Sequence, residues 1–192
     1  MFYRHLDRDK VRALSSSNND FDVNMSLSQE AINDITWSKD NIHVQNGKPI
    51  RPEKITIYIE TDASNKGWGA NFKGKTTGGR WIQNESMQHI NILELRAVKF
   101  ALKSLCQNIR NVHISARCDN STAVAYINNQ GGSIVSLLKE TQEIWLWCHD
   151  RNIHISSVHI AGKANVTADY LSRNFSDSTE WKLNESIFRK IC

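Results

Sequence analysis

Four acidic residues stand where a carboxylate can do chemistry. Two of them close stretches of alternating residues, KITIYIETD (residues 54–62) and NVHISARCD (residues 111–119). Alternation with a period of two predicts strands whose apolar side chains face one way while Asp62 and Asp119 face the other. An aspartate at a strand end is either a turn-former or a functional group. Functional sites in α/β sheets lie at the carboxyl ends of parallel strands.

The third acid, Glu94, lies in NILELRAVKFALKSL (residues 91–105), where apolar residues recur at steps of three and four. This spacing predicts a helix with Glu94 on or beside its apolar stripe. Burying a carboxylate is costly unless a partner compensates, and a metal ion is one such partner. The alternative is that Glu94 reaches solvent at the edge of the stripe or pairs with Arg96 or Arg80.

The fourth acid, Asp169, belongs to HIAGKANVTADYLSRN (residues 159–174), which ends in a short predicted helix. Taken alone, it would be an ordinary helical aspartate paired with Arg173. Together, however, the four acids come from two strand ends and two helices that strand order can bring to one edge of a sheet. Hydrolysis of a phosphodiester can use two divalent ions about 4 Å apart. Because Mg²⁺ prefers carboxylate ligands, three or four such acids would suffice to hold them.

The elements that must position these acids follow one another in a regular order. After the first strand come two stretches separated by a Lys/Gly turn, which predict a hairpin. Strands then alternate with helices. This order predicts an α/β fold with a mixed five-stranded sheet, three antiparallel strands followed by strands alternating with helices, and helices on both faces. The predicted strands cover residues 54–62, 67–74, 76–83, 111–119 and 152–162, and the helices cover 91–105, 121–129, 133–151 and 165–174.

The composition outside this region divides the chain. Within the first part, residues 6–14 predict a short helix, and Ser26 and Gln29 have the spacing of a capping box before a second one. NGKPIRPE (residues 46–53) contains both prolines and predicts a linker. We therefore expect an N-terminal connector with two short helices and a linker at 1–53, a compact domain at 54–175, and a tail at 176–192 that stops within a further helix. That ending predicts a fragment of a larger polyprotein or a repurposed copy.

Charge and hydropathy restrict the class of protein. The 192 residues carry a formal net charge of +4, and a pI of about 8.9 is compatible with a polyanionic partner. No stretch approaches the roughly 20 consecutive apolar residues of a membrane span, and the first residues lack the apolar core of a secretory signal. The four cysteines form no CxxC pair. We expect an intracellular protein, cytoplasmic or nuclear, with reduced thiols and no membrane partner.

Four motifs, TDASNKGWGA, HINILELRA, CDNSTAVAYIN and HIAGKANVTADYLSR, together resemble a type 1 ribonuclease H domain, most closely that of DIRS-type retrotransposon reverse transcriptase polyproteins. The resemblance covers about residues 54–175. It implies an enzyme that cleaves the RNA strand of RNA–DNA hybrids with two Mg²⁺ or Mn²⁺ ions. It further implies that Asp62 bridges both ions, Glu94 and Asp119 serve mainly one, and Asp169 serves the other. The implied partners are the hybrid and the reverse transcriptase region of the same polyprotein.

Further residues near these motifs are expected to bind substrate. The resemblance places Asn91 where the family contacts the minor groove of the hybrid, in which RNA displays its 2′-hydroxyls. Asn91 would serve equally well as a helix cap. Asn120 and Ser121 either touch the scissile backbone or cap the helix that begins there. Ser64, in the TDAS motif, and His159 complete the expected substrate-binding set.

The chain also departs from the family pattern. Cellular members carry a mobile histidine at the position that holds Gly162 here, and His159 occupies an earlier, usually structural position. The segment NNQGGS (residues 128–133) lacks the Lys/Arg cluster that many members use to grip substrate. Phosphate contacts dominate affinity for nucleic acids, so we expect weak affinity for the hybrid unless a neighbouring domain helps. The candidate phosphate contacts are Lys73, Lys75, Arg80, Lys163 and Arg173.

Two other functions compete with the hybrid nuclease. One is a catalytically weak or inactive connector or nucleic-acid-binding module derived from a retroelement, which would be marked by the loss of one of the acids. None of the four is lost, which favours an enzyme. The other is a transposase or junction nuclease of related fold. Such proteins use a different spacing of acids and lack the helical glutamate of the LEL motif.

Overall fold

The structure of the protein, a computed structural model, describes residues 3–45 and 54–175. The predicted linker at 46–53 and the predicted tail at 176–192 therefore lie outside the described residues. The strands are β1 (Ile57–Ala63), β2 (Gly67–Phe72), β3 (Lys75–Arg80), β4 (His113–Cys118) and β5 (His154–His159). The helices are α1 (Arg4–Ser16), α2 (Gln29–Gln45), α3 (Gln83–Ser86), α4 (Ile90–Leu105), α5 (Ser121–Asn128), α6 (Val135–His149) and α7 (Val166–Arg173), with a short 3-10 turn at Gly162–Ala164.

The five strands form one mixed sheet in the order β3-β2-β1-β4-β5. β1 pairs with β2, and β2 with β3, in antiparallel fashion. β4 and β5 join them in parallel. This arrangement confirms the sheet that the sequence predicts. It also makes β1 and β4 neighbours that run in the same direction, so their carboxyl ends meet at one edge.

The turn between β2 and β3 explains the register of the hairpin. Phe72 pairs with Lys75, which leaves a loop of two residues. Lys73 and Gly74 both have positive φ, 50° and 81°. Positive φ at both loop positions defines the turn whose twist matches that of a two-stranded ribbon, and glycine adopts it at no steric cost.

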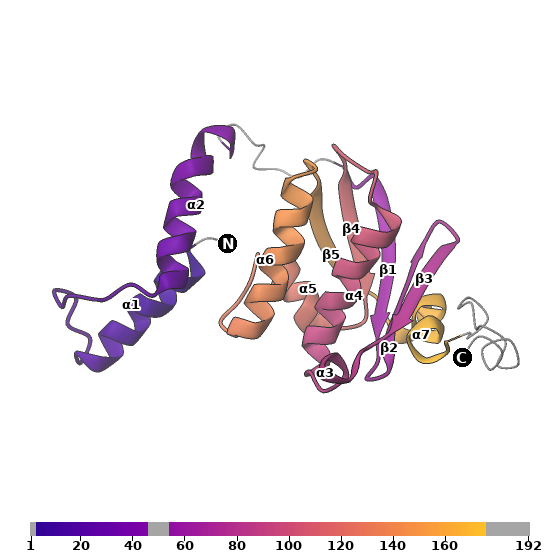
Figure 1. Ribbon diagram of the computed structural model, residues 1–192, viewed down its shortest axis with the longest axis horizontal. Coiled ribbons are helices and arrows are strands. Elements are labelled where there is room, and N and C mark those ends of the chain that lie inside the picture. Colours follow the sequence, from indigo (N-terminus) through magenta and orange to yellow (C-terminus); the bar gives the residue numbers. More distant parts are fainter. Residues whose placement is uncertain (1–2, 46–53, 176–192) are drawn as a thin grey trace, which may run out of the picture.

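Helices cover the two faces of the sheet unequally (Figure 1). α4, α5 and α6 lie on one side, and α7 lies on the other against β1, β2 and β3. α7 approaches closely because β2 presents a glycine to it. A Cβ atom on Gly69 would stand 2.3 Å from the carbonyl oxygen of Ala168 and 2.6 Å from the Cβ atom of Leu171. The sequence of β2 thus sets the position of the helix that carries Asp169.

The hydrophobic core fills the space between the sheet and α4, α5 and α6. The alternation that predicts the strands places fully buried isoleucines from the sheet against apolar residues of the helices. The buried Trp68 and Trp81 both pack against Phe100 of α4. Members of the core that are at most 2 % exposed include Ile59, Leu95, Val98, Leu102, Ile114, Ile127, Ile144 and Ile155.

The N-terminal helices α1 and α2 pack against each other. Within their contact, the Nδ1 atom of His5 lies 2.7 Å from a carboxylate oxygen of Asp34, and both residues are buried. The predicted capping box at Ser26 is wrong, because α2 begins at Gln29 and the Ser28 hydroxyl accepts the amide N–H of Ala31. Among the described residues, no helix combines the length and apolar character that crossing a membrane requires.

Candidate active site

Three of the four predicted acids converge at the edge where β1 and β4 end. Asp62 is the penultimate residue of β1, Asp119 directly follows β4, and Glu94 lies in α4. Each offers a carboxylate oxygen, and these three oxygens all lie within 4.8 Å of one another. Parallel neighbouring strands produce the convergence, since their carboxyl ends share one edge.

Burial distinguishes these acids from ordinary surface carboxylates. Asp62 is 2 % exposed and Glu94 is 3 % exposed, whereas Asp119 is partly exposed. The Oε2 atom of Glu94 is buried without a hydrogen-bond partner among the described residues. The alternative in which Glu94 pairs with Arg96 is wrong, because the Arg96 guanidinium binds Glu140 at 2.7 Å and Glu85 at 3.6 Å instead.

The pKa values follow from burial and from the proximity of like charges. Burial, with smaller contributions from the neighbouring Asp62 and Asp119, raises the pKa of Glu94 to about 9, while a hydrogen bond from the Ala63 main chain opposes the rise. Burial also raises the pKa of Asp62 to about 6, against the hydrogen bond from Ser172, while Asp119 and Asp169 add to the rise. The cluster is therefore short of positive charge, because each ionised acid disfavours the ionisation of the next.

The residues present fit a divalent cation. Hard cations such as Mg²⁺ and Mn²⁺ bind carboxylate oxygens, and three such oxygens lie together here. The unpartnered Oε2 atom of Glu94 is the most direct sign, because a buried polar atom without a partner is destabilising unless something fills that role. The acids line an open cavity of about 460 Å³.

Helix α7 holds Asp62 in place through Ser172, a residue that the sequence analysis did not single out. The Ser172 hydroxyl lies 2.6 Å from Asp62 Oδ2 and 2.9 Å from the carbonyl oxygen of Asp169. A hydroxyl carries one proton, so it donates to only one of these acceptors at a time. Ser172 is fully buried. The sequence signal is its place three residues after Asp169, on the helical side that carries the acid.

Two more buried hydrogen bonds tie the α7 segment to the strands. The Asn165 side-chain amide donates to the carbonyl oxygen of Thr61 at 2.8 Å. Ser64, expected to bind substrate, lines the cavity of the acids and donates its hydroxyl to the carbonyl oxygen of Ser172 at 2.6 Å. The same Ser64 hydroxyl accepts the amide N–H groups of Lys66 and Gly67 in the β1–β2 turn. The structure thus gives Ser64 a role in joining this turn to α7.

Asp169, the fourth predicted acid, lies outside the group of three. Its carboxylate accepts a hydrogen bond from Nε of Arg173 at 2.8 Å. This is the ordinary helical pair that the sequence offers as the alternative. Asp169 is close enough to contribute to the raised pKa of Asp62, so it belongs to the surroundings of the cluster without joining it.

Asn91 and Asn120 form one polar pair beside the cluster. Asn120 donates from Nδ2 to Oδ1 of Asn91 at 2.9 Å, and its own Oδ1 caps α5 by accepting the amide N–H of Ala123. The expectation that Asn91 caps α4 is wrong, because that cap is His89, whose Nδ1 accepts the Asn91 amide N–H. Ser121 is the exposed first residue of α5.

The loop between β5 and α7 faces Asp119. His159 is exposed, and its Nε2 atom lies 3.1 Å from the main-chain oxygen of Asp119. A Cβ atom on Gly162 would stand 3.0 Å from Oδ2 of Asp119. Position 162 therefore borders the carboxylate cluster, while His159 contacts the main chain behind it.

Comparison with known proteins bears on the fold and on the polyprotein relationship. No protein-family model matches the chain. The chain is 28% identical over 157 residues to the putative enzymatic polyprotein of Cassava vein mosaic virus, covering 76% of this chain and 24% of the relative. It is 30% identical over 138 residues to the enzymatic polyprotein of Figwort mosaic virus, covering 66% and 20%. The chain thus spans about a quarter or less of the length of these curated relatives.

A solved structure identifies the fold. The crystal structure of LC11-RNase H1 in complex with RNA/DNA hybrid matches with a TM-score of 0.50 and 19% sequence identity, and the match covers 60% of this chain and 93% of that one. At that identity the likeness speaks for the fold alone. Together with the strand order and the mixed sheet, it shows that this chain has the ribonuclease H-like fold.

Proposed function

We propose that the chain is a metal-dependent ribonuclease H of type 1, which hydrolyses the RNA strand of RNA–DNA hybrids. The observation that carries the proposal is the convergence of Asp62, Glu94 and Asp119 with a buried, unpartnered oxygen on Glu94. The order of the four motifs and the ribonuclease H-like fold support it. All four acids of the expected set are present, which argues against an inactive connector.

The proposed cofactor is a pair of Mg²⁺ ions, or of Mn²⁺ ions. When bound, such ions activate a water molecule and stabilise the charge that develops on a phosphodiester. Asp62, oriented by Ser172, would offer an oxygen to both ions. Glu94 would give up its proton on binding, because only the ionised carboxylate is a good ligand. Asp119, which is partly exposed, would be a further ligand of the ion that Glu94 binds.

We propose that Asp169 is a ligand of the second ion. In the structure its carboxylate is bound to Arg173, so ion binding there competes with that pair. The Asp169 side chain is 42% exposed, and an exposed ion pair contributes little free energy, up to about 1 kcal/mol. We therefore expect the pair to yield to a divalent ion without unfolding α7.

Substrate selection is proposed for the polar pair beside the cluster. Asn120 lines the cavity of the acids and donates to Asn91, and amide groups can donate to and accept from 2′-hydroxyl groups. Asn120 would keep its capping bond while its Nδ2 group turns from Asn91 to the substrate. We propose supporting roles for Ser121, at the exposed start of α5, and for His159, behind Asp119.

The biological setting proposed is a retroelement polyprotein of the DIRS type or a related one. The similarity to viral enzymatic polyproteins supports the polyprotein part of this proposal. Residues 54–175 would form the nuclease domain, and residues 1–53 the connector to a reverse transcriptase region, which would be its partner. Such a protein would act inside the cell, in the cytoplasm or nucleus, where RNA–DNA hybrids form.

The test is a cleavage assay on the purified chain. Labelled RNA–DNA hybrid, RNA duplex and DNA duplex are each incubated with Mg²⁺, Mn²⁺ or EDTA. We expect metal-dependent cleavage of the RNA strand in the hybrid alone. Asp119→Asn should abolish it, whereas Asp150→Asn, an exposed acid after α6, should not. A folded wild-type chain that cleaves nothing with either metal would refute the proposal.

A further inference from the structure

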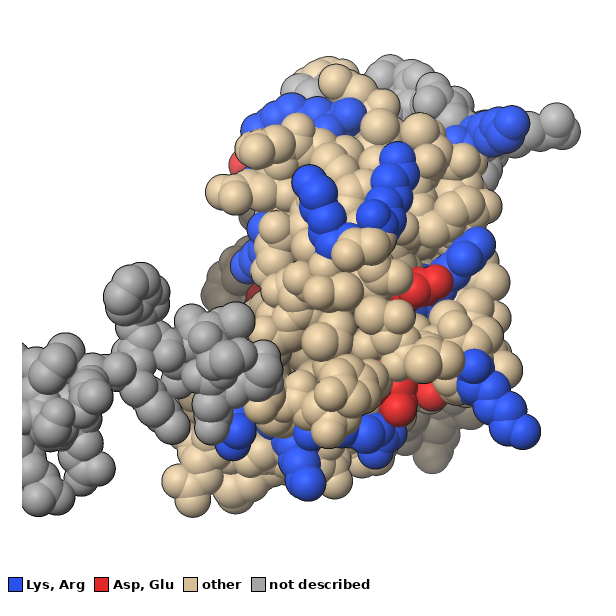
Figure 2. Space-filling model, turned by 90° about the vertical axis from the view of Figure 1, so that its right-hand side faces the viewer, with Lys and Arg blue, Asp and Glu red and all other residues tan. Residues whose placement is uncertain are grey.

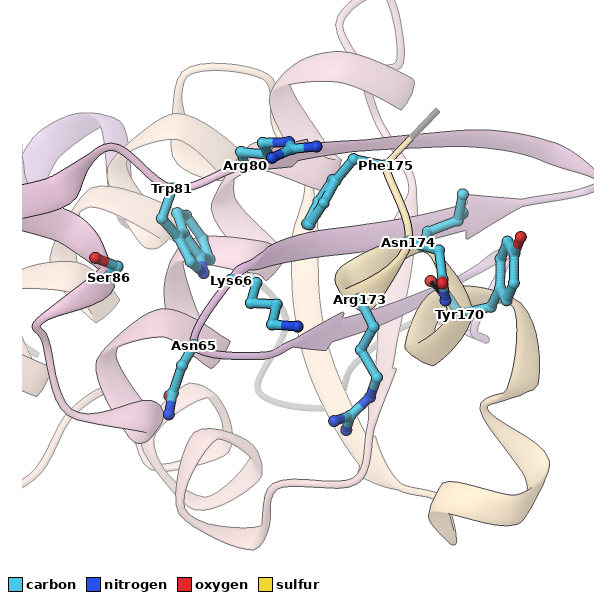
Figure 3. Close-up of a pocket in the computed structure, with 10 residues that line it drawn as sticks. Asn65, Lys66, Arg80, Trp81, Ser86, Tyr170, Arg173, Asn174 and Phe175 are labelled. Carbon is cyan, nitrogen blue, oxygen red and sulfur yellow. Dashed lines mark hydrogen bonds between the residues drawn. The ribbon is translucent and has the colours of Figure 1, made fainter. Parts of the chain in front are cut away.

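A second open cavity, of about 730 Å³, adjoins the carboxylate site (Figure 3). Its walls come from the β1–β2 turn, the end of β3, the end of α3 and the last turn of α7. Its volume falls in the range of ligand-binding pockets, about 300–1,000 Å³. The lining residues are Asn65, Lys66, Arg80, Trp81, Ser86, Tyr170, Leu171, Arg173, Asn174 and Phe175. We call this cavity the basic pocket.

The charge of the basic pocket is opposite to that of the carboxylate site. Three cations line it, Lys66, Arg80 and Arg173, and among the described residues no acid does. Lys66 and Arg173 extend into the same space in Figure 3. Figure 2 shows basic side chains spread over the face that carries α7 and β3, with acidic side chains confined to small patches. Such a pocket favours an anion.

Aromatic rings complete the lining and suit a nucleotide. The guanidinium group of Arg80 lies 4.9 Å from the ring centroid of Phe175. Gly67 makes room for that ring, because a Cβ atom at position 67 would stand 2.3 Å from its Cζ atom. The Trp81 indole is fixed by a hydrogen bond to the carbonyl oxygen of Ser64. Tyr170 is exposed on the opposite wall. Cations that bind phosphate, set beside rings that stack on bases, characterise grooves for a nucleic-acid strand.

The two cavities are adjacent, because Asn65 and Arg173 line both of them. Arg173 donates from Nε to Asp169 on the acidic side, and a guanidinium group keeps further N–H donors for a second acceptor. A strand whose phosphate lies at the acids can therefore pass directly into the basic pocket.

We propose that the basic pocket binds a phosphate and its nucleoside on the strand being cleaved, adjacent to the scissile position. This inference rests on the proposed function. Lys66 and Arg80 supply positive charge to the phosphate from different walls of the pocket, and the rings of Phe175 and Tyr170 contact the base or sugar. The pocket thereby fixes where the strand lies relative to the acids. It also supplies cations that residues 128–133 lack.

The test of the phosphate contact is binding without cleavage. Hybrid affinity is measured in EDTA at several salt concentrations for the wild type and for the double variant Lys66→Ala/Arg80→Ala. The control is Lys103→Ala/Lys139→Ala, which removes the same charge from exposed positions of α4 and α6. We expect the pocket variant to bind about 10-fold more weakly, with a salt dependence reduced by about one to two phosphate contacts. Equal affinity and equal salt slope in the two double variants would overturn the proposal.

The test of register is a map of cleavage sites. On a hybrid with end-labelled RNA and Mg²⁺, the wild type should cut at preferred positions, and Lys66→Ala/Arg80→Ala should spread or shift them. Phe175→Ala should reduce the wild-type sensitivity to an abasic nucleotide placed beside the preferred cut. An unchanged map in both variants would refute the pocket while leaving the nuclease intact. Absence of cleavage by the wild type would refute the nuclease, and the EDTA binding experiment would still decide the pocket.

Discussion

Helix α4 carries two buried clusters of charge that are built in opposite ways. Near its start, Glu94 meets Asp62 and Asp119, and its Oε2 atom has no protein partner among the described residues. Further along, Lys99 donates to Glu140 at 2.6 Å and to Glu143 at 2.9 Å. Arg96, from the same helix, binds the other oxygen of Glu140.

The two clusters differ in whether the protein itself supplies the positive charge that balances the buried acids. Burial alone would lower the pKa of Lys99, but its hydrogen bonds to Glu140 and Glu143 raise it above the ordinary value. The α4–α6 cluster is thus complete within the protein and joins two helices. In the Glu94 cluster the like charges repel one another, and no cation of the described residues balances them, so burial and this repulsion raise the pKa of Glu94. Removing one partner of a buried ion pair is strongly destabilising, whereas a buried acid that lacks a cation in a cleft is a candidate for a functional site.

The largest effect is expected from Glu94→Gln. The substitution keeps the shape of the side chain and removes one proposed ligand. Losing residues that merely orient a ligand typically costs 10–100-fold, so we expect hybrid cleavage to fall by more than about 100-fold. Steady-state cleavage rates in Mg²⁺ measure it. Retention of wild-type rates would show that Glu94 is a structural acid.

The matching substitution in the α4–α6 cluster, Glu140→Gln, should lower the stability of the fold and leave the cleavage activity unchanged. It leaves Arg96 and Lys99 without their shared acid, although Lys99 keeps Glu143. Breaking a buried pair on one side costs about 3 kcal/mol or more. Urea unfolding should therefore show a loss of that order, with cleavage by the folded protein unchanged. A loss of activity without a loss of stability would break the distinction between the clusters.

A smaller effect is expected when Asp62 loses the hydrogen bond that orients it. Ser172→Ala removes the hydrogen bond that holds down the pKa of Asp62. We expect affinity for Mn²⁺ to fall about 10-fold, as for other residues that position a ligand. Titration calorimetry measures the affinity, and Ser136→Ala, an exposed serine of α6, is the control. Equal affinities in the two variants would mean that Asp62 keeps its place without Ser172.

The pH dependence of metal-free stability should have an unusual sign. The pKa of Glu94 is raised from 4.5 to about 9 in the folded state. Between these values the folded protein holds a proton that the unfolded chain has lost, so its stability falls as pH rises. The slope from this group is at most about 1.4 kcal/mol per pH unit. Urea unfolding in EDTA from pH 5 to 8 should show this fall in the wild type relative to Glu94→Gln. Parallel profiles would contradict it.

The sequence predicted the elements and most of the acids for clear physical reasons. Strand alternation gives the direction of Asp62 and Asp119, and helical spacing places Glu94 on an apolar stripe. The sequence pattern does not predict which side chains from distant segments contact one another. Lys66 carries no pattern of its own, and the place of Ser172 on the side of Asp169 does not reveal that it binds Asp62, so both roles appear only in the folded chain. The pairing of Glu140 with Lys99 depends likewise on how α6 packs against α4.

The most direct test is thermal unfolding of wild type and Glu94→Gln, each with EDTA and with Mn²⁺. If the acids are kept for a cation, Mn²⁺ at 100 times its dissociation constant should stabilise the wild type by about 2.7 kcal/mol. Glu94→Gln should be at least as stable as wild type in EDTA and should lose most of the Mn²⁺ effect. A variant that is less stable in EDTA, yet gains as much from Mn²⁺ as the wild type, would contradict the account.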